Sequence, residues 1–179
     1  MTRIVLCGFM GCGKSTVGRE LAARLGYGFV DTDALVEAQY GGPVRDCFAA
    51  EGEAGFRRRE AEVCRALAGR ERLVIAAGGG TVLQPDALAA LRPGALLLYL
   101  SVAPETVLRR LRGDSTRPLL QTADPAATVR ALLAARDPLY RAAADAVLEA
   151  DGPAADVAER AFRLICEKSA QTIASPFPV

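Results

Sequence analysis

The sequence contains no histidine, so it lacks the side chain that most often moves protons near neutral pH. Any proton transfer must therefore depend on another group, such as a carboxylate. Lysine is also scarce, because only Lys14 and Lys168 occur among 22 basic residues. The longest apolar run, at residues 95–100, is far shorter than the ~20 residues of a spanning helix, which argues against a membrane protein.

The charge balance and the cysteines exclude further classes of protein. With 22 basic and 21 acidic residues, the net charge of +1 creates no overall field that would favour nucleic acid or an anionic membrane. The five cysteines include no pair at the two-residue gap typical of zinc sites, which favours reduced, mostly buried thiols. The apolar stretch near the N-terminus, about seven residues long, is too short for a signal peptide and indicates a cytoplasmic protein.

The remaining composition, 179 residues with 51% hydrophobic and 24% charged side chains, indicates one globular domain. Short apolar runs predict strands that are covered on both faces, at residues 3–8, 27–31, 73–78, 95–101 and 146–150. Between the first two runs, Val17, Leu21 and Leu25 recur at helical spacing and stop at Gly26, a favourable residue after a helix. This alternation predicts an α/β fold with a parallel sheet and helices on both faces.

Two segments depart from the alternation. Residues 35–62 are rich in charge and helix-forming residues but supply no strand, and residues 112–120 form a polar stretch that contains proline. Both are interpreted as excursions from the core. Residues 169–179 carry two prolines and no periodicity, which predicts a flexible tail after a single domain at residues 1–168.

Residues 8–15, Gly-Phe-Met-Gly-Cys-Gly-Lys-Ser, match the pattern G-x-x-x-x-G-K-[ST] between the first predicted strand and the first predicted helix. The glycines let backbone N–H groups turn toward a phosphate, Lys14 reaches the β- and γ-phosphates, and the Ser15 hydroxyl ligates Mg²⁺. The plainer alternative is a turn that needs glycine for its shape alone. The complete pattern in this context favours a nucleoside triphosphate site, with the candidates Gly11, Cys12, Gly13, Lys14, Ser15 and Thr16.

Further motifs indicate which class of nucleotide-binding protein this sequence belongs to. The sequence has no Asn-Lys-x-Asp guanine-recognition motif. Together with the glycine-rich loop, the motifs DTD (31–33), GFRRRE (55–60), GGG (78–80), RPLL (117–120) and RDPLY (136–140) resemble the shikimate kinase family. They occur in that family's order, and the resemblance covers nearly the whole chain.

The resemblance implies a three-layer P-loop fold of the nucleoside monophosphate kinase type, with a five-stranded parallel sheet in the order 2-3-1-4-5. By this resemblance, the two excursions correspond to a substrate-binding segment, about residues 32–62, and a lid, about residues 111–123. The resemblance also implies transfer of the γ-phosphoryl group of ATP to the 3-hydroxyl of shikimate, on the route to aromatic amino acids. The expected ligands are therefore ATP, Mg²⁺ and shikimate, and the expected protein is a monomer.

The motif residues suit a small acid with a hydroxyl group to phosphorylate. By resemblance, Arg57 and Arg136 bind the carboxylate, where a planar guanidinium can contact two oxygens at once. The turn of Gly78, Gly79 and Gly80 lies at the substrate, and Gly79 offers it a backbone N–H. Without side chains, the turn lets a ligand approach the main chain closely.

The two aspartates of the DTD motif provide carboxylates. By resemblance, Asp33 accepts hydrogen bonds from substrate hydroxyls and takes the proton of the attacking one. Its ordinary pKa, about 4, favours orientation and late proton transfer over early abstraction from an alcohol. Asp31 is expected to hold a water molecule on Mg²⁺. The alternative for both residues is a helix N-cap or a solvated turn, where aspartate is common.

Three residues are assigned to the nucleotide only through the resemblance. Arg117, in the lid, closes over the phosphates as an arginine finger from the same chain. Arg110 lies near the adenine, and Pro153 belongs to the loop that contacts the base. Because arginine is abundant in this chain, a solvated surface position is the alternative for any one of these arginines.

Two other functions would be compatible with part of these motifs. A kinase of the same fold for another hydroxy acid, such as gluconate, would also need arginines at its substrate. A nucleotide-binding regulatory protein without turnover would keep the glycine-rich loop. The full set of motifs argues against the first, and the presence of Lys14, Asp33 and Arg117 as candidate catalytic residues argues against the second.

Overall fold

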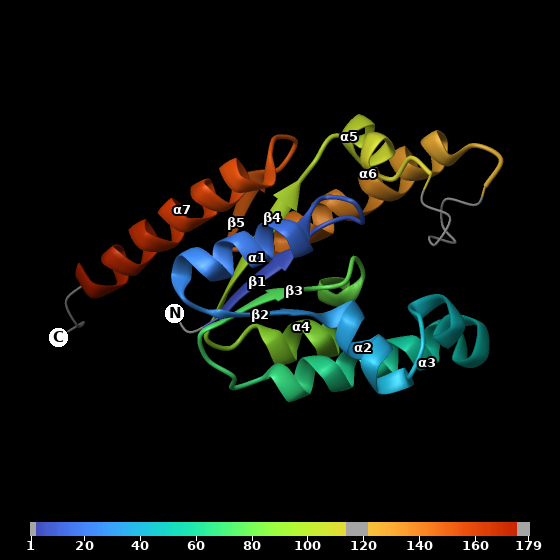
Figure 1. The fold of residues 1–179 in the computed structure, drawn as a ribbon, viewed down its shortest axis with the longest axis horizontal. Helices are drawn as coiled ribbons and strands as arrows, with labels where there is room; N and C mark the ends of the chain where they lie inside the picture. Colours follow the sequence, from blue (N-terminus) through green and yellow to red (C-terminus); the bar gives the residue numbers. More distant parts are fainter. Residues whose placement is uncertain (1–2, 114–121, 175–179) are drawn as a thin grey trace.

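Five parallel strands form one sheet at the centre of the molecule (Figure 1). The structure is a computed structural model that describes residues 3–113 and 122–174. The predicted strands are all present, and their order, β2-β3-β1-β4-β5, confirms the predicted topology. Their bounds are Arg3–Cys7 for β1, Gly28–Asp31 for β2, Leu73–Ala76 for β3, Ala95–Ser101 for β4 and Ala146–Glu149 for β5.

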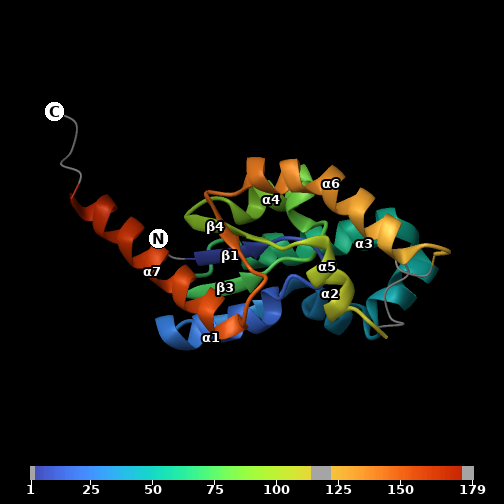
Figure 2. The ribbon, with the colours of Figure 1, turned by 90° about the horizontal axis from the view of Figure 1, so that it is seen from above.

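Helices cover both faces of this sheet, as the alternation predicted. Their bounds are Lys14–Leu25 for α1, Thr32–Tyr40 for α2, Val44–Leu67 for α3, Pro85–Leu91 for α4, Pro104–Arg110 for α5, Pro125–Ala143 for α6 and Ala154–Ala174 for α7, with a short 3₁₀ helix η1 at Thr81–Leu83. Helices α1 and α7 pack together on one face, whereas α4 and α6 lie on the other (Figure 2). No helix in the described part of the chain combines the length and apolar character needed to cross a membrane.

The centre of the sheet is buried on both faces, which explains the unbroken apolar runs in the sequence. Every residue of β1 and of β3 is buried, and Val5 lies beside Ile75 in the register of these strands. The basic residue of β1, Arg3, is 3% exposed, and its guanidinium donates to the backbone carbonyls of Leu67 (2.9 Å) and Pro93. These bonds compensate for burying its charge.

Helix α1 begins and ends at glycines that adopt left-handed backbone conformations. Gly13 precedes the helix with φ of 99°, and Gly26 follows it with φ of 64°. The Gly26 N–H donates to the carbonyls of Ala22 and Ala23, which satisfies groups at the end of the helix. The predicted end of this helix at Gly26 is confirmed.

The structure describes all of the first predicted excursion, residues 35–62, but only part of the second, residues 112–120. Between β2 and β3 the described residues form α2 and α3 and no strand. Helix α3 is bent at Gly52, whose φ of 67° and ψ of −177° are not helical. Of the predicted lid at residues 111–123, residues 114–121 lie outside the part of the chain that the structure describes, and Arg117 is among them.

The predicted boundary between the domain and a flexible tail at residue 168 needs correction. Helix α7 continues to Ala174, so the first part of the expected tail is helical. Residues 169–174 contain no proline, and the first proline of the segment, Pro176, comes two residues after the end of α7. Residues 175–179 lie outside the described residues.

The cysteines are thiols without disulfide partners, as predicted. Cys7, Cys12, Cys47 and Cys64 are buried, and Cys166 is exposed. Burial raises the pKa of the Cys7 and Cys64 thiols to about 12. These two side chains therefore stay protonated and behave as small apolar residues of the core.

Candidate active site

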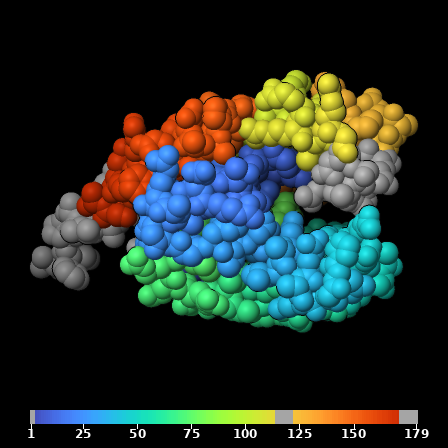
Figure 3. Space-filling view, viewed as in Figure 1, coloured from blue at the N-terminus to red at the C-terminus, as the bar shows by residue number. Residues whose placement is uncertain are grey.

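The segments that carry the sequence motifs meet at the carboxyl ends of three neighbouring strands. The glycine-rich loop follows β1, Asp31 ends β2, and the Gly78–Gly80 turn follows β3. Ligands of parallel α/β sheets bind at this edge. The surface is hollowed between α3 and α5, where blue atoms from the beginning of the chain and green atoms from the segment after β3 are visible (Figure 3).

The glycine-rich loop has the backbone geometry of a phosphate cradle. Gly8, Gly11 and Gly13 have φ values of 141°, 73° and 99°, a region that favours glycine. A Cβ on Gly8 would lie 2.7 Å from a backbone carbonyl oxygen of β4, so a larger residue does not fit. Lys14 Nζ donates to the carbonyls of Gly8 (2.9 Å) and Phe9 (3.0 Å). The ammonium group is therefore held at the loop, where the positive end of α1 also lies.

Ser15 and Asp31 form an oxygen pair beside the loop. The Ser15 hydroxyl donates to Asp31 Oδ2 at 2.5 Å, and Asp31 Oδ1 accepts the backbone N–H of Asp33 at 3.0 Å. Asp31 is thus the N-cap of α2, as the plainer alternative predicted, while its second oxygen contacts the loop. Mg²⁺ prefers oxygen ligands and often takes only one or two from the protein, with phosphates and water as the others. The pair fits such a site.

The first turn of α2 packs on the glycine turn after β3. The Gly78 N–H donates to Thr32 Oγ1 at 2.8 Å. A Cβ on Gly78 would lie 2.4 Å from Asp33 Oδ1 and 2.8 Å from Glu60 Oε1. Glycine is therefore required for the Asp33 carboxylate to lie against the backbone of the turn.

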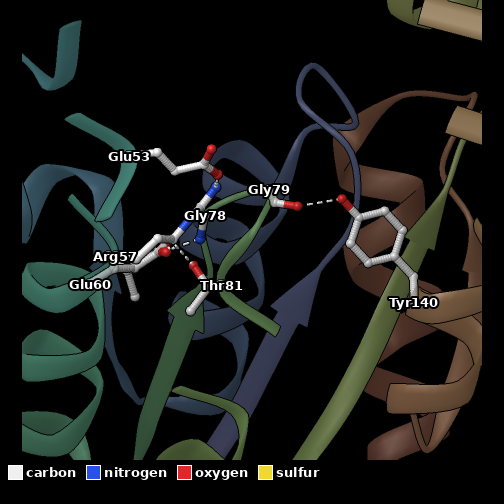
Figure 4. Close-up of polar contacts among 8 residues, drawn as sticks. Glu53, Arg57, Glu60, Gly78, Gly79, Thr81 and Tyr140 are labelled. Atoms are coloured by element: carbon white, nitrogen blue, oxygen red, sulfur yellow. Dashed lines mark hydrogen bonds and ion pairs between the residues drawn. The ribbon is translucent and has the colours of Figure 1, made fainter. Parts of the chain in front are cut away.

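Arg57, on α3, is held at the same turn by two carboxylates. Its Nη1 pairs with Glu60 at 2.6 Å and its Nη2 with Glu53 at 3.3 Å (Figure 4). Burial opposes the charge of the guanidinium, but the two carboxylates outweigh burial and raise the pKa of Arg57 above its ordinary value. A Cβ on Gly80 would lie 2.6 Å from Arg57 Nη1, so glycine lets the charged group approach the turn.

Two residues of this region, Glu60 and Tyr140, were not predicted from the sequence as part of the site. Glu60 is 1% exposed and accepts hydrogen bonds from Arg57 and from the Thr81 hydroxyl. Its three-residue spacing from Arg57 was a usable signal, because residues i and i+3 share one face of a helix. Tyr140, the last residue of RDPLY, donates to the Gly79 carbonyl, and no local pattern in the sequence indicates that contact.

Helix α6 brings further groups to the glycine-rich loop and the glycine turn. The guanidinium carbon of Arg136 lies 5.9 Å from the centroid of the Phe9 ring in the loop. Tyr140, one helical turn later, bonds to Gly79 (Figure 4). A Cβ on Gly79 would lie 3.7 Å from the backbone nitrogen of Met10, so the turn and the loop are in contact. Loop, turn and α6 therefore form one continuous surface.

A hydrogen-bonded chain attaches α6 to β4. The Tyr99 hydroxyl donates to Asp137 Oδ1 at 2.8 Å, and Arg141 Nε donates to Asp137 Oδ2 at 2.6 Å. The Arg141 bond holds the pKa of Asp137 below its ordinary value, although burial opposes this effect, and the Tyr99 bond adds to it. Asp137 therefore stays ionised at neutral pH and anchors the helix that carries Arg136.

Arg110 joins the glycine-rich loop to the segment after β5. Its Nη1 donates to the carbonyls of Gly11 (3.3 Å) and Cys12 (3.1 Å), and its Nη2 donates to that of Ala150 (2.9 Å). The latter segment leads to Pro153, directly before α7. The two residues assigned to the adenine by resemblance are thus near one another, beside the loop.

The described candidates gather in this one region. Thr16 is exposed in the first turn of α1, and Cys12 is buried in the loop, with its Sγ 3.7 Å from Lys14 Nζ. Arg117 belongs to the residues that the structure does not describe.

Comparison with known proteins agrees with the motifs. The family model described as shikimate kinase matches residues 10–168. The chain is 50% identical to a shikimate kinase of Halorhodospira halophila over 151 residues, which are 84% of this chain and 85% of the relative. Its identity to a shikimate kinase of Symbiobacterium thermophilum is 54% over 143 residues, 79% of this chain and 82% of the relative. The chain belongs to the shikimate kinase family.

Solved shikimate kinases share the whole fold. A shikimate kinase from Acinetobacter baumannii, determined in complex with shikimate, has a TM-score of 0.89 and 40% identity, with 94% of each chain covered. A gluconokinase from Sinorhizobium meliloti has a TM-score of 0.58 and 16% identity, covering 97% of this chain and 98% of its own, which shows a common fold alone. The resemblance to shikimate kinases that the motifs indicated is confirmed, and the chain is a kinase of that family.

Proposed function

We propose that this protein transfers the γ-phosphoryl group of ATP to the 3-hydroxyl of shikimate, giving shikimate 3-phosphate and ADP. The observation that carries the proposal is a direct contact: the turn that packs against Asp33 and Arg57 also touches the glycine-rich loop of Lys14. A related structure, 40% identical, was determined with shikimate. The groups that we assign to the phosphates and to the acid thus lie side by side.

The glycine-rich loop binds the triphosphate in this proposal. Its backbone N–H groups and the N-terminal end of α1 attract phosphate oxygens, and Lys14 exchanges its carbonyl partners for them. Ser15 would hold Mg²⁺ directly and Asp31 through water; when bound, the ion neutralises charge on the β- and γ-phosphates. Arg110 and Pro153 lie on the side of the loop where we assign the adenine.

Shikimate lies between α3, the glycine turn and α6. Arg57 and Arg136 bind its carboxylate through paired hydrogen bonds, which a lysine could not match. The buried Glu60 keeps the Arg57 guanidinium charged and oriented. The amide groups of the Gly78–Gly80 turn and the Asp33 carboxylate bind the ring hydroxyls, so the acid end and the hydroxyl end of the substrate are both fixed.

The reaction needs little covalent participation by the protein. The 3-hydroxyl oxygen forms a bond to the γ-phosphorus while the bond from that phosphorus to the β,γ-bridging oxygen breaks. Asp33 orients the hydroxyl and receives its proton late, when bonding to phosphorus has made it acidic. Lys14 and Arg117 stabilise the charge on the moving phosphoryl group. ADP keeps the electron pair of the broken bond.

A steady-state assay of ADP release with three acceptor conditions tests the proposal. With ATP and Mg²⁺, we expect rapid release with shikimate and only background release with gluconate or with no acceptor. Faster turnover with gluconate would identify another hydroxy acid kinase. Equal background in all three conditions, from protein that binds ATP, would favour a nucleotide-binding protein without turnover.

Replacing Arg57 by alanine is expected to raise KM for shikimate by about 10- to 100-fold, the loss of a charged, paired contact. The kcat and the KM for ATP should change little, because Arg57 contacts neither phosphates nor the attacking oxygen in this proposal. Arg58→Ala is the matched control, since Arg58 is the exposed neighbour on the same helix. Steady-state kinetics that show a large fall in kcat and an unchanged shikimate KM would contradict the assigned role.

A further inference from the structure

Tyr140 is a buried tyrosine whose one polar atom reaches the glycine turn. Its exposure is 0%, and its ring packs against Tyr99 with the ring centroids 5.1 Å apart. Its hydroxyl donates to the carbonyl oxygen of Gly79, which joins α6 to the segment after β3 across 61 residues of sequence (Figure 4). Buried tyrosine hydroxyls need a partner, and here the partner is the backbone of the proposed substrate site.

The bonded carbonyl of Gly79 and the N–H of Gly80 belong to one peptide group. No peptide in the described residues is cis, so these two groups point in opposite directions. With the oxygen directed to Tyr140, the Gly80 N–H is directed to the other side of the turn, where Arg57 lies. Neither the Gly79 N–H nor the Gly80 N–H donates to a backbone carbonyl among residues 3–113 and 122–174.

Three successive glycines leave this peptide group unusually easy to rotate, because no side chain restricts either flanking residue. A rotation would exchange the positions of the carbonyl and the N–H, and an acceptor would then face an anionic, hydroxylated substrate. The Tyr140 bond opposes that rotation, because rotation would break the hydrogen bond between the buried hydroxyl and the Gly79 carbonyl.

We infer that Tyr140 is a positioning residue, which holds the Gly79–Gly80 peptide with its N–H directed toward the substrate. The inference rests on the proposed function, in which that turn binds shikimate. It also explains why arginine and tyrosine are four residues apart in RDPLY, because Arg136 and Tyr140 then share one face of α6. Burial raises the pKa of Tyr140 to about 12, while the nearby charge of Arg136 opposes this rise, so the hydroxyl stays protonated and can donate.

The variant Tyr140→Phe removes the hydroxyl and keeps the ring in the core. We expect KM for shikimate to rise about tenfold, the effect of one poorly oriented hydrogen bond, while KM for ATP stays within about twofold. Tyr27→Phe is the control, because it also removes a tyrosine hydroxyl but lies directly before β2, at the opposite edge of the sheet from the turn. Equal changes in both KM values, or an unchanged KM for shikimate, would overturn the inference.

A second measurement needs no substrate. The order parameters of the Gly79 and Gly80 amides, from ¹⁵N NMR relaxation, should be lower in Tyr140→Phe than in the wild type or Tyr27→Phe, because the peptide is freer to rotate. This measurement tests the positioning role of Tyr140 without any substrate. Failure of the wild-type protein to phosphorylate shikimate would overturn the proposed function but not this role. If Tyr140→Phe does not fold, 4-aminophenylalanine at this position keeps a donor and should preserve both KM values; a tenfold rise there would also refute the role.

Discussion

Asp33→Asn is expected to lower kcat by about 10²- to 10⁴-fold, the usual contribution of a positioned acid–base group. The asparagine keeps the size of the side chain, and the backbone N–H of residue 33 keeps its bond to Asp31. What is lost is a carboxylate that lies against Gly78, beside the glycine turn, and that can accept the proton of the attacking hydroxyl. Binding of ATP should change by less than about twofold, because Lys14 and Ser15 are untouched.

The measurement combines steady-state kinetics with direct titration of ATP. Asp86→Asn is the matched control, because Asp86 is also an aspartate in the first turn of a helix, α4, and is exposed. The control should keep the wild-type kcat. An Asp33→Asn protein that retains most of its kcat would remove Asp33 from the chemistry and leave it as a packing residue.

Arg117→Ala is expected to lower kcat by about 10³- to 10⁵-fold, the range measured for arginine fingers in phosphoryl transfer. Arg117 belongs to the RPLL motif between α5 and α6, and its role is derived from the family resemblance together with the charge that develops on the phosphoryl group. KM for shikimate should change little. The effect is thus the opposite of that expected for Arg57→Ala, which raises KM and preserves kcat.

Arg130→Ala serves as the control, because Arg130 is an exposed arginine of α6, outside the predicted lid. Single-turnover measurements of phosphoryl transfer separate the chemical step from product release. A large increase in shikimate KM with an unchanged rate of the chemical step would show that Arg117 binds the acid rather than the phosphoryl group.

The sequence predicted the elements of this fold well because each strand is an apolar run. Strands such as β1 and β3 are buried on both faces, and this leaves a continuous signal in the sequence. The order of the strands came from the family resemblance, because apolar runs of similar composition do not reveal which one lies beside which. The sequence did not predict that α7 continues to Ala174. The two prolines of residues 169–179 were interpreted as the sign of a tail that begins at residue 169.

The site was predictable where its chemistry is local. The glycine-rich loop places its phosphate-binding groups within one short stretch, so a pattern alone locates Lys14 and Ser15. Tyr140 was missed because its partner, Gly79, is 61 residues away in the sequence. For Glu60, the spacing from Arg57 was a usable local signal, but the bond from Thr81 spans 21 residues. Only the packing of α3 and α6 against the turn reveals what these side chains hold in place.

A crystal structure with shikimate and a non-hydrolysable ATP analogue tests the coupling of the two binding regions most directly. We expect the 3-hydroxyl oxygen of shikimate about 3–3.5 Å from the γ-phosphorus, the distance of a near-attack geometry. Asp33 should then accept a bond from that hydroxyl, Arg57 should pair with the carboxylate, and Lys14 should contact the γ-phosphate. Shikimate bound away from the glycine turn, with its hydroxyls out of reach of the γ-phosphate, would contradict the mechanism.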